Sequence, residues 1–180
     1  MTEPEASRVV LREWRDDDLS AFADLNADTR VMAHFPKTLT RSESDEMVSR
    51  IRAHFVDRGF GLWAVEVPNL APFIGFVGLS VPRFKAHFTP CVEVGWRIAH
   101  AHWNQGFATE AARAVVTHGF SELGLSEIVS FTVPHNRASR RVMEKLNMTH
   151  DPDDDFEHPS LPVGHPHRRH VVYRLAKPSL

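Results

Sequence analysis

The stretch WNQGFATEA at 103–111 combines residue types that could bind a phosphate group. A glycine-marked turn leads there into a segment whose apolar residues recur with helical spacing. The first four N–H groups of a helix have no partner within the helix, and the helix dipole adds about half a positive charge at that end. Gly106 and Ala108 would let a diphosphate approach the main chain without meeting a bulky side chain. An ordinary tight turn between a strand and a helix explains these residues equally well.

A second group of residues that could do chemistry lies just upstream, in the strand-like segment 91–98. Side chains alternate between the two faces of a strand, so Glu93, Gly95 and Arg97 lie opposite the apolar residues of this segment. Partial burial would raise the pKa of the Glu93 carboxyl, which could then remove a proton from an amine directly or through water. In the alternative interpretation, Glu93 only forms an ion pair with Arg97 on the same face.

The N-terminal third of the chain predicts one strand and two helices that could support these residues. Residues 8–12 alternate as in a strand, and the acidic run that follows them suits the start of a helix. Thr40 and Glu43 have capping-box spacing, and Gly59 can end a helix in the left-handed conformation. These signals predict a second helix over about 41–57.

The rest of the chain predicts further strands and two more helices, in an order that defines the fold class. The clearest element is a helix over about 108–123, with a regular apolar face and with Gly124 at its end. Asn136 precedes a shorter helix that Asn147 can end. Strands are predicted at 62–67, 73–80, 91–98, 127–133 and 169–175. This order predicts an α/β (α+β) fold, with a central, mixed, mostly antiparallel sheet and helices on both of its faces.

Length and composition favour one globular domain over residues 1–180, without internal repeats or a linker. A net charge of −2 provides no basic surface for nucleic acid, so a nucleic-acid partner is not expected. Cys91 is the only cysteine, the start of the chain lacks the features of a secretory leader, and the longest apolar stretch is too short to span a bilayer. These features predict a cytoplasmic protein that does not enter a membrane.

Three motifs follow one another along the second half of the chain: EVGWRI at 93–98, WNQGFATEA at 103–111 and NRASRRVMEKLNM at 136–148. Together they resemble the GNAT superfamily of acetyl-CoA-dependent N-acetyltransferases, and specifically its RimJ/RimL-like branch. The opening VVLREW, the segment FGLWAVE and the closing HRRHVVYRL extend the likeness over nearly the whole chain. The resemblance implies a single-domain GNAT fold with about seven strands in its sheet, and acetyl-CoA as the co-substrate.

The resemblance also assigns residues to acetyl-CoA. In the family, the glycine turn binds the diphosphate of coenzyme A through main-chain amides. The preceding strand separates from its neighbour, so that its main chain can pair with the pantetheine amides like an added strand. A residue at the position of Asn136 contacts coenzyme A as well, a role that can coexist with capping the helix. The cofactor-binding residues expected on this basis are Trp96, Arg97, Ile98, Gln105, Gly106, Phe107, Ala108, Thr109, Asn136 and Ser139.

Two departures from the family pattern concern the turn and the proton donor. Trp103 stands where Gln or Arg often opens the turn, a change that leaves phosphate binding by the main chain intact. Met143 stands where many members have a tyrosine that protonates the departing thiolate, and the only tyrosine, Tyr173, lies elsewhere. A serine in an N-x-x-S motif can replace it in the RimJ/RimL-like branch. The expected catalytic residues are therefore Glu93 as the base and Ser139 as the proton donor.

The acceptor is expected to be a primary amine that attacks the thioester directly, and proton chemistry favours an α-amino group. A lysine side chain with a pKa near 10.4 is only about 0.04% neutral at pH 7, whereas an α-amino group with a pKa near 8 is about 10% neutral. This difference of about 3.3 kcal/mol favours a protein N-terminus. A small-molecule amine or an antibiotic stays open as the acceptor. A non-catalytic module that only binds acyl-CoA stays open as well, and so does a homodimer.

The remaining polar clusters have simpler interpretations. The acidic run Asp151–Asp155 could attract a cationic amine, but a run of like charges is usually solvated surface. His165, His167 and His170 are the densest group of histidines, yet their spacing matches no zinc pattern. We therefore expect them in a surface loop and expect no metal. Cys91 is interpreted as a small buried apolar residue rather than a nucleophile.

Overall fold

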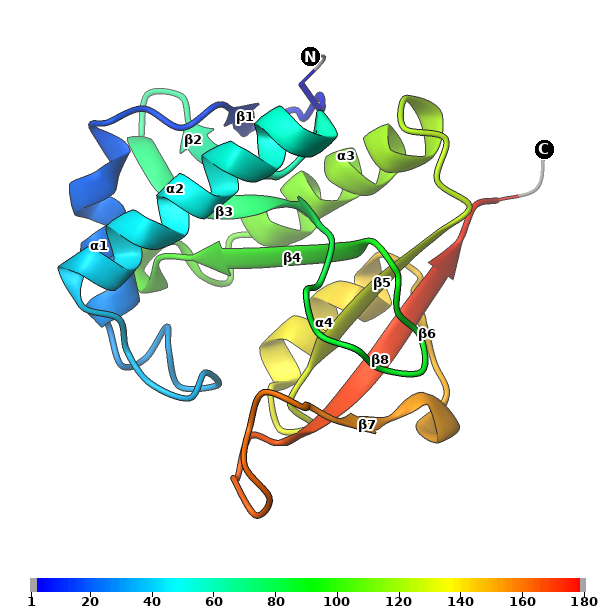
Figure 1. Cartoon of the computed structure of the whole chain (residues 1–180). Helices are drawn as coiled ribbons and strands as arrows, with labels where there is room; N and C mark the ends of the chain where they lie inside the picture. Colours follow the sequence, from blue (N-terminus) through cyan, green and yellow to red (C-terminus); the bar gives the residue numbers. More distant parts are fainter. Residues whose placement is uncertain (1–2, 179–180) are drawn as a thin grey trace.

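The computed structural model describes residues 3–178, and within them the chain forms an eight-stranded sheet (Figure 1). The strand order is β1-β2-β3-β4-β5-β8-β6, with β7 also paired to β8, and the pairing of β4 with β5 is parallel while the others are antiparallel. The predicted mixed, mostly antiparallel sheet is confirmed. The strands are β1 Val10–Arg12, β2 Leu62–Val67, β3 Ala71–Ser80, β4 Glu93–Ile98, β5 Glu127–Thr132, β6 Thr149–His150, β7 Phe156–Glu157 and β8 Arg169–Ala176.

The α-helices cover both faces of the sheet (Figure 1). The ring of Phe22 in the first helix packs edge-on 5.9 Å from that of Phe76 in β3, whereas Gly119 of the third helix lies against Leu79 of the same strand. Since Phe76 and Leu79 point to opposite faces, helices on both faces are confirmed. The α-helices are α1 Asp18–Ala27 and α2 Arg41–Arg58 on one face, and α3 Phe107–Ser121 with α4 Arg137–Lys145 on the other; η1 His100–His102 and η2 Pro152–Asp154 are short 3₁₀ turns.

Local sequence signals set the ends of these helices. Thr40 accepts a hydrogen bond from the main-chain N–H of Glu43, and the Glu43 carboxylate accepts one from the N–H of Thr40, which completes the capping box of α2. Gly59 ends α2 with a φ of 76°. The side chain of Asn136 caps α4 by accepting from the N–H of Ser139 at 3.2 Å. These predicted caps are confirmed, and the last one fixes two residues of the candidate site.

The parallel strands β4 and β5 stay together for only a short distance before they diverge (Figure 1). Glu93 pairs with Val129, and the N–H of Val129 donates to the carbonyl of Val92 at 2.9 Å. On its other edge, β4 remains paired with β3 as far as Ile98. The edge of β4 that faces β5 is therefore open over its last residues, and a gap forms in the middle of the sheet.

A buried cluster of charges joins the first strand to its neighbours. Arg12 is only 5% exposed, and it donates to both carboxylate oxygens of Asp18 at 2.8 Å and to Glu66 at 2.8 Å. The hydrogen bond to Asp18 raises the pKa of the Arg12 guanidinium, against the opposing effect of burial. Two carboxylates thus satisfy one buried arginine and connect β1 with α1 and β2.

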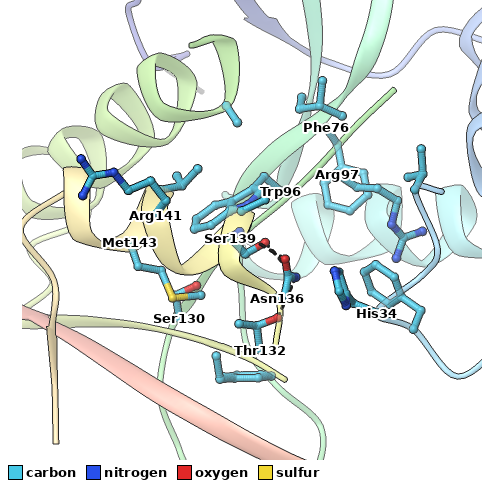
Figure 2. A pocket seen from close by; sticks show the side chains of 18 of the residues that line it. His34, Phe76, Trp96, Arg97, Ser130, Thr132, Asn136, Ser139, Arg141 and Met143 are labelled. Carbon is cyan, nitrogen blue, oxygen red and sulfur yellow. Dashed lines mark hydrogen bonds between the residues drawn. The ribbon is translucent and has the colours of Figure 1, made fainter. Parts of the chain in front are cut away.

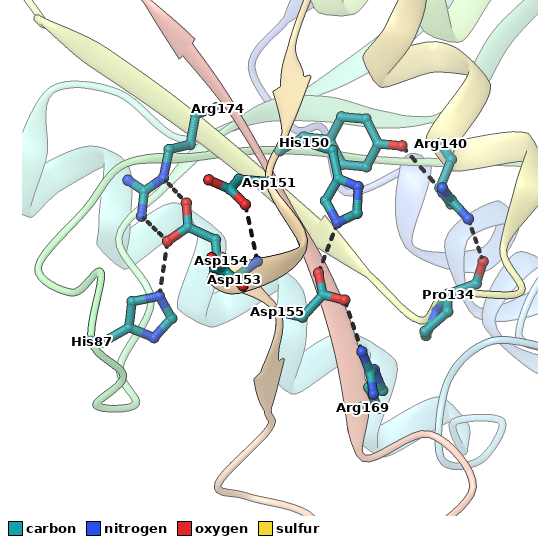
Figure 3. Close-up of polar contacts among 11 residues, drawn as sticks. His87, Pro134, Arg140, His150, Asp151, Asp153, Asp154, Asp155, Arg169 and Arg174 are labelled. Carbon is teal, nitrogen blue, oxygen red and sulfur yellow. Dashed lines mark hydrogen bonds and ion pairs between the residues drawn. The ribbon is translucent and has the colours of Figure 1, made fainter.

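The acidic segment Asp151–Asp155 is bound to neighbouring strands rather than simply solvated (Figure 3). Asp154 forms an ion pair with Arg174 of β8 at 2.5 Å, and Asp155 is hydrogen-bonded to His150 of β6 at 2.8 Å and ion-paired with Arg169 of β8 at 3.2 Å. The interpretation of this run as solvated surface is therefore wrong for these two aspartates, because basic side chains of the sheet hold them in place. Neither aspartate lines the cavity described below.

Two strands of the sheet were not predicted from the sequence. β6 and β7 have two residues each, and so short a segment carries no alternation that a sequence could show. The domain predicted over 1–180 includes residues 1–2 and 179–180, which lie outside the described part of the chain. Within residues 3–178, no helix has the length and apolar character needed to cross a membrane.

Candidate active site

A cavity of about 740 Å³ lies at the gap between β4 and β5 and extends from the start of α3 to the loop between α1 and α2. Every residue predicted for catalysis or for acetyl-CoA binding lines this cavity except Gln105, whose side chain donates to the carbonyl of Ala101 at 3.1 Å instead. Figure 2 shows Ser139 of α4 on one side of the cavity, with Arg97 and His34 on the other. The fold thus brings residues from three separate motifs to one place.

The start of α3 forms one end of the cavity and offers unpaired amides. Gly106 precedes the helix with a φ of 85°, and no side chain of the described residues caps the first turn. The N–H groups of residues 107–109 therefore lack helical partners. Arg141 and Lys145 of α4 line the cavity, and the Arg8 guanidinium, which is ion-paired with Glu110 at 2.7 Å, would lie 3.2 Å from a Cβ at position 106. This end of the cavity suits an anion.

The open edge of β4 lines the middle of the cavity. Hydrogen bonds alternate along an antiparallel pair, and the N–H of Ala99 donates to β3 at 2.8 Å. By the same alternation, the N–H and C=O of Arg97 form hydrogen bonds with β3. The N–H and C=O groups of Trp96 and Ile98 point the other way, toward the gap. The register thus corrects the expectation that the main chain of Arg97 is free for pantetheine. Trp103 donates its indole N–H to the carbonyl of Ile98 at 2.7 Å, which leaves both main-chain groups of Trp96 for a ligand.

Glu93 lies at the other end of β4, where its carboxyl accepts one side-chain hydrogen bond from the described residues. The hydroxyl of Ser80 donates to it at 3.5 Å. Burial raises the pKa of Glu93 to about 8, while the hydrogen bond from Ser80 acts in the opposite direction. No cation of the described residues contributes to this pKa, so the alternative interpretation of Glu93 as a simple ion-pair partner of Arg97 is not supported. A carboxyl in this state can exchange a proton near neutral pH.

Ser139 lies in the first turn of α4, with its hydrogen bonds drawn in Figure 2. The Nδ2 of Asn136 donates to the Oγ of Ser139 at 3.0 Å and to Thr132 at 3.0 Å, and its Oδ1 accepts from the N–H of Ser139. Because the Ser139 oxygen already accepts from Asn136, its own O–H is available to donate to another group. Tyr173 does not line the cavity, and its hydroxyl accepts from Arg140 at 3.2 Å.

The wall near the loop between α1 and α2 contains His34, which the sequence patterns did not single out, together with His167. The rings of His34 and His167 lie 5.1 and 5.5 Å from that of His135. His165 and His167 lie in the loop before β8, as expected, whereas His170 belongs to β8, and His167 and His170 both line the cavity. Among residues 3–178, no group of three or more potential ligands is placed to hold a metal ion. Loops distant in sequence form this wall, so no local pattern could reveal it.

Cys91 is a half-buried free thiol that packs against a small apolar cluster beside β5. Burial raises the pKa of this thiol to about 11. It is therefore a poor nucleophile near neutral pH, and it does not line the cavity.

Comparison with known families decides what this arrangement is. The family described as the acetyltransferase (GNAT) domain matches residues 8–149, which include most of the cavity's lining. The chain belongs to the GNAT family. This GNAT protein is an acetyl-CoA-dependent N-acetyltransferase, as the resemblance of its motifs implied.

Individual GNAT relatives agree with this assignment. The protein is 30% identical over 146 residues to the uncharacterized N-acetyltransferase YoaA of Bacillus subtilis (strain 168), which covers 79% of this chain and 80% of YoaA. A GNAT-family acetyltransferase from Bacillus anthracis shares the fold with a TM-score of 0.78 at 24% identity, over 97% of this chain and 98% of that chain. The alpha-N-protein acetyltransferase RimL in complex with coenzyme A has a TM-score of 0.75 at 15% identity, over 97% of this chain and 98% of that chain.

Proposed function

We propose that this GNAT enzyme transfers the acetyl group of acetyl-CoA to an α-amino group, by direct attack of the amine on the thioester. The observation that carries the proposal is that Glu93 and Ser139, from β4 and α4, line one cavity whose far end offers the free amides of α3. In this proposal Glu93 accepts the amine proton, and Ser139 donates a proton to the departing sulfur.

The cavity suits an extended acyl carrier with a diphosphate at one end. The amides of residues 107–109 and the glycine at 106 would hold the diphosphate, with Arg8 beside them. The free N–H and C=O of Trp96 would pair with a pantetheine amide as an added strand does. Acetyl-CoA bound in this way supplies a thioester carbon that an amine can attack. Glu93 begins β4 and α3 follows the end of β4, so a carrier with its diphosphate at α3 would place its acyl group near Glu93.

In this proposal two side chains, Glu93 and Ser139, carry out both proton transfers of the reaction. The neutral amine forms a C–N bond with the acyl carbon, and the C–S bond breaks. The ionised Glu93, whose pKa is raised to about 8 by burial, takes the proton that the nitrogen releases. Ser139 gives its O–H proton to the sulfur while Asn136 holds its oxygen at 3.0 Å, and the proton held by Glu93 then returns to Ser139 through water. No covalent enzyme intermediate is needed.

The choice of an α-amino acceptor follows from the strength of the base. A carboxylate whose conjugate acid has a pKa of about 8 matches an α-amino group, whose pKa is also near 8, much better than a lysine side chain near 10.4. The relative RimL, which shares the fold, is described as an alpha-N-protein acetyltransferase and was seen with coenzyme A. Both points favour an N-terminal amine as the acceptor.

Matched peptides test this proposal. One peptide has a free N-terminus and no lysine, and the other has a blocked N-terminus and one lysine. Each is incubated with the enzyme and acetyl-CoA, release of free thiol is followed, and mass spectrometry locates the acetyl group. We expect faster thiol release with the first peptide, and acetylation at its α-amino group. Acetylation of the lysine peptide alone would contradict the proposal, and so would the absence of thiol release with either peptide.

A further inference from the structure

Two arginines are buried within residues 3–178, and only one of them has acidic partners there. Arg12 is 5% exposed and is paired with both Asp18 and Glu66. Arg97 is 8% exposed, yet no carboxylate of residues 3–178 lies within ion-pair distance of it. Burial alone lowers the pKa of Arg97 to about 10, whereas its acidic partners raise that of Arg12. A buried cation without an anion is costly, because desolvation is not offset.

The surroundings of Arg97 leave one edge of its guanidinium free. Its plane lies near the rings of Phe35 at 4.3 Å and Phe76 at 5.4 Å. Both of its side-chain hydrogen bonds leave from Nη1, to Asn26 at 2.5 Å and to the sulfur of Met47 at 3.8 Å. Nε is buried and has no partner among the described residues. The edge formed by Nε and Nη2 is the edge that binds a carboxylate through two parallel hydrogen bonds.

The unpaired buried side-chain nitrogens all gather at the same cavity. In residues 3–178 there are three, the Nδ1 of His34, the Nε of Arg97 and the Nδ1 of His167, and all three residues line the cavity. Figure 2 shows His34 between Arg97 and the start of α4. Buried polar atoms are normally satisfied, and the Nε of Arg97 can only donate, so this unpaired nitrogen points to a missing acceptor atom from a ligand.

This cluster lies on the acceptor side of the cavity rather than on the side proposed for the diphosphate. Arg97 pairs in register with Phe76, whose face of the sheet is covered by α1, whereas α3 lies against the opposite face. Glu93 and Arg97 share one face of β4, with Gly95 between them. A Cβ at Gly95 would meet nothing closer than Glu93 at 3.8 Å, so the floor between Glu93 and Arg97 is open.

We propose that the amine acceptor also carries a carboxylate, which the free edge of Arg97 binds while the amine reaches Glu93. The inference rests on the proposed transfer to an amine and names the class of acceptor. An amino acid or a peptide with an acidic side chain provides this chemistry. His34 and His167, whose pKa values are lowered by burial, lie in the same wall and can serve as further hydrogen-bonding groups for the acceptor.

Acceptor pairs that differ only in the carboxylate test the inference. One arm uses N-terminal peptides with Glu or Gln at the second or third position, and the other uses γ-aminobutyrate and γ-aminobutyramide. Binding to enzyme saturated with coenzyme A, which allows no transfer, is measured by calorimetry. We expect the carboxylate member of at least one pair to bind about 10- to 100-fold more tightly. The arm with the larger ratio identifies a peptide or a small molecule as the source.

The variant Asn26→Asp makes the test specific to Arg97. It replaces the amide oxygen at 2.5 Å from Nη1 by a carboxylate of the same size, so that the protein supplies the missing anion itself. We expect the ratio to fall to within about threefold of unity in this variant. The control Arg52→Gln removes a cation that pairs with Asp16 outside the cavity, and it should leave the ratio unchanged. A role of Arg97 in the fold alone predicts equal ratios in all three proteins.

The outcomes separate this inference from the proposed function. Equal binding of both members of every pair by the wild type would overturn the inference, whether or not the enzyme transfers acetyl groups. So would a ratio that Asn26→Asp leaves intact. Thiol release with acetyl-CoA is measured separately on the same pairs. Its absence, together with a binding preference that Asn26→Asp removes, would refute the transfer and support the carboxylate site.

Discussion

Replacing Glu93 by Gln tests the assigned base through two independent readouts, stability and rate. The substitution keeps the shape of the side chain and removes its ability to ionise. In the folded protein, burial raises the pKa of Glu93 to about 8, whereas the ordinary value for a glutamate is 4.5. Between these two values the folded protein holds a proton that the unfolded chain has lost. Stability therefore falls as pH rises through this window.

The structure sets the size of this effect. Each pH unit inside the window costs about 1.4 kcal/mol, so between pH 5 and pH 7 the wild type loses at most about 2.7 kcal/mol relative to Glu93→Gln. Because the side chain lines the cavity, water there reduces the loss, and we expect about 1–2 kcal/mol. Urea denaturation of both proteins at the two pH values measures it. A difference in stability that does not change with pH would refute the reasoning from burial.

The rate provides the second readout. Near pH 7 the wild-type profile of kcat/KM contains two ionisations, that of Glu93 and that of the α-amino acceptor, whereas Glu93→Gln keeps only that of the amine. At pH 8 we expect kcat/KM to be about 100-fold lower in the variant, with a shallower rise from pH 6 to pH 8. Glu127→Gln on β5 is the control, because this residue pairs with Arg174 outside the cavity. If Glu93→Gln had the same kcat/KM as the wild type, with the same dependence on pH, Glu93 would not be the base.

Three further substitutions test other parts of the structure. Ser139→Ala should lower kcat by about 10- to 100-fold with little change in coenzyme A affinity, as measured by steady-state kinetics and calorimetry. Gly106→Val should weaken coenzyme A binding by at least about tenfold, because a β-branched residue disfavours the φ of 85° that opens the first turn of α3. Asp18→Ala should lower the free energy of unfolding by about 3–5 kcal/mol, because it leaves the buried Arg12 with one carboxylate.

Each of these expectations has a result that would contradict it. Equal losses of turnover and of cofactor affinity in Ser139→Ala would assign that residue to binding. Unchanged affinity in Gly106→Val would remove the diphosphate from the start of α3. A cost below about 1 kcal/mol in Asp18→Ala would mean that Arg12 is not held by the ion pair.

The sequence was most informative where a local signal determines local structure. The capping box of Thr40 and Glu43 and the N-cap Asn136 predicted the helix starts, because such bonds involve residues only three positions apart. The apolar period of α3 was equally direct, since its buried face follows the helical repeat. The helices located in this way, together with the predicted strands, gave the order of elements that predicts a sheet with helices on both faces. They also placed the glycine turn at the start of a helix.

Features that depend on contacts between distant segments could not be predicted. The hydrogen-bonding direction of Arg97 depends on its register against β3, which one strand does not reveal. The rings of His34 and His167 both lie near that of His135 only because loops distant in sequence approach each other in the fold. The free guanidinium edge of Arg97 is likewise visible only once Phe35, Phe76 and Asn26 are seen around it.

The central claim is that the gap between β4 and β5 holds acetyl-CoA with its thioester between Glu93 and Ser139. A crystal structure of the enzyme with coenzyme A tests it most directly. We expect the diphosphate to accept hydrogen bonds from the amides of residues 107–109, a pantetheine amide to pair with Trp96, and the sulfur to lie within hydrogen-bonding reach of Ser139. A coenzyme bound outside this gap, or a sulfur far from both Glu93 and Ser139, would contradict the account.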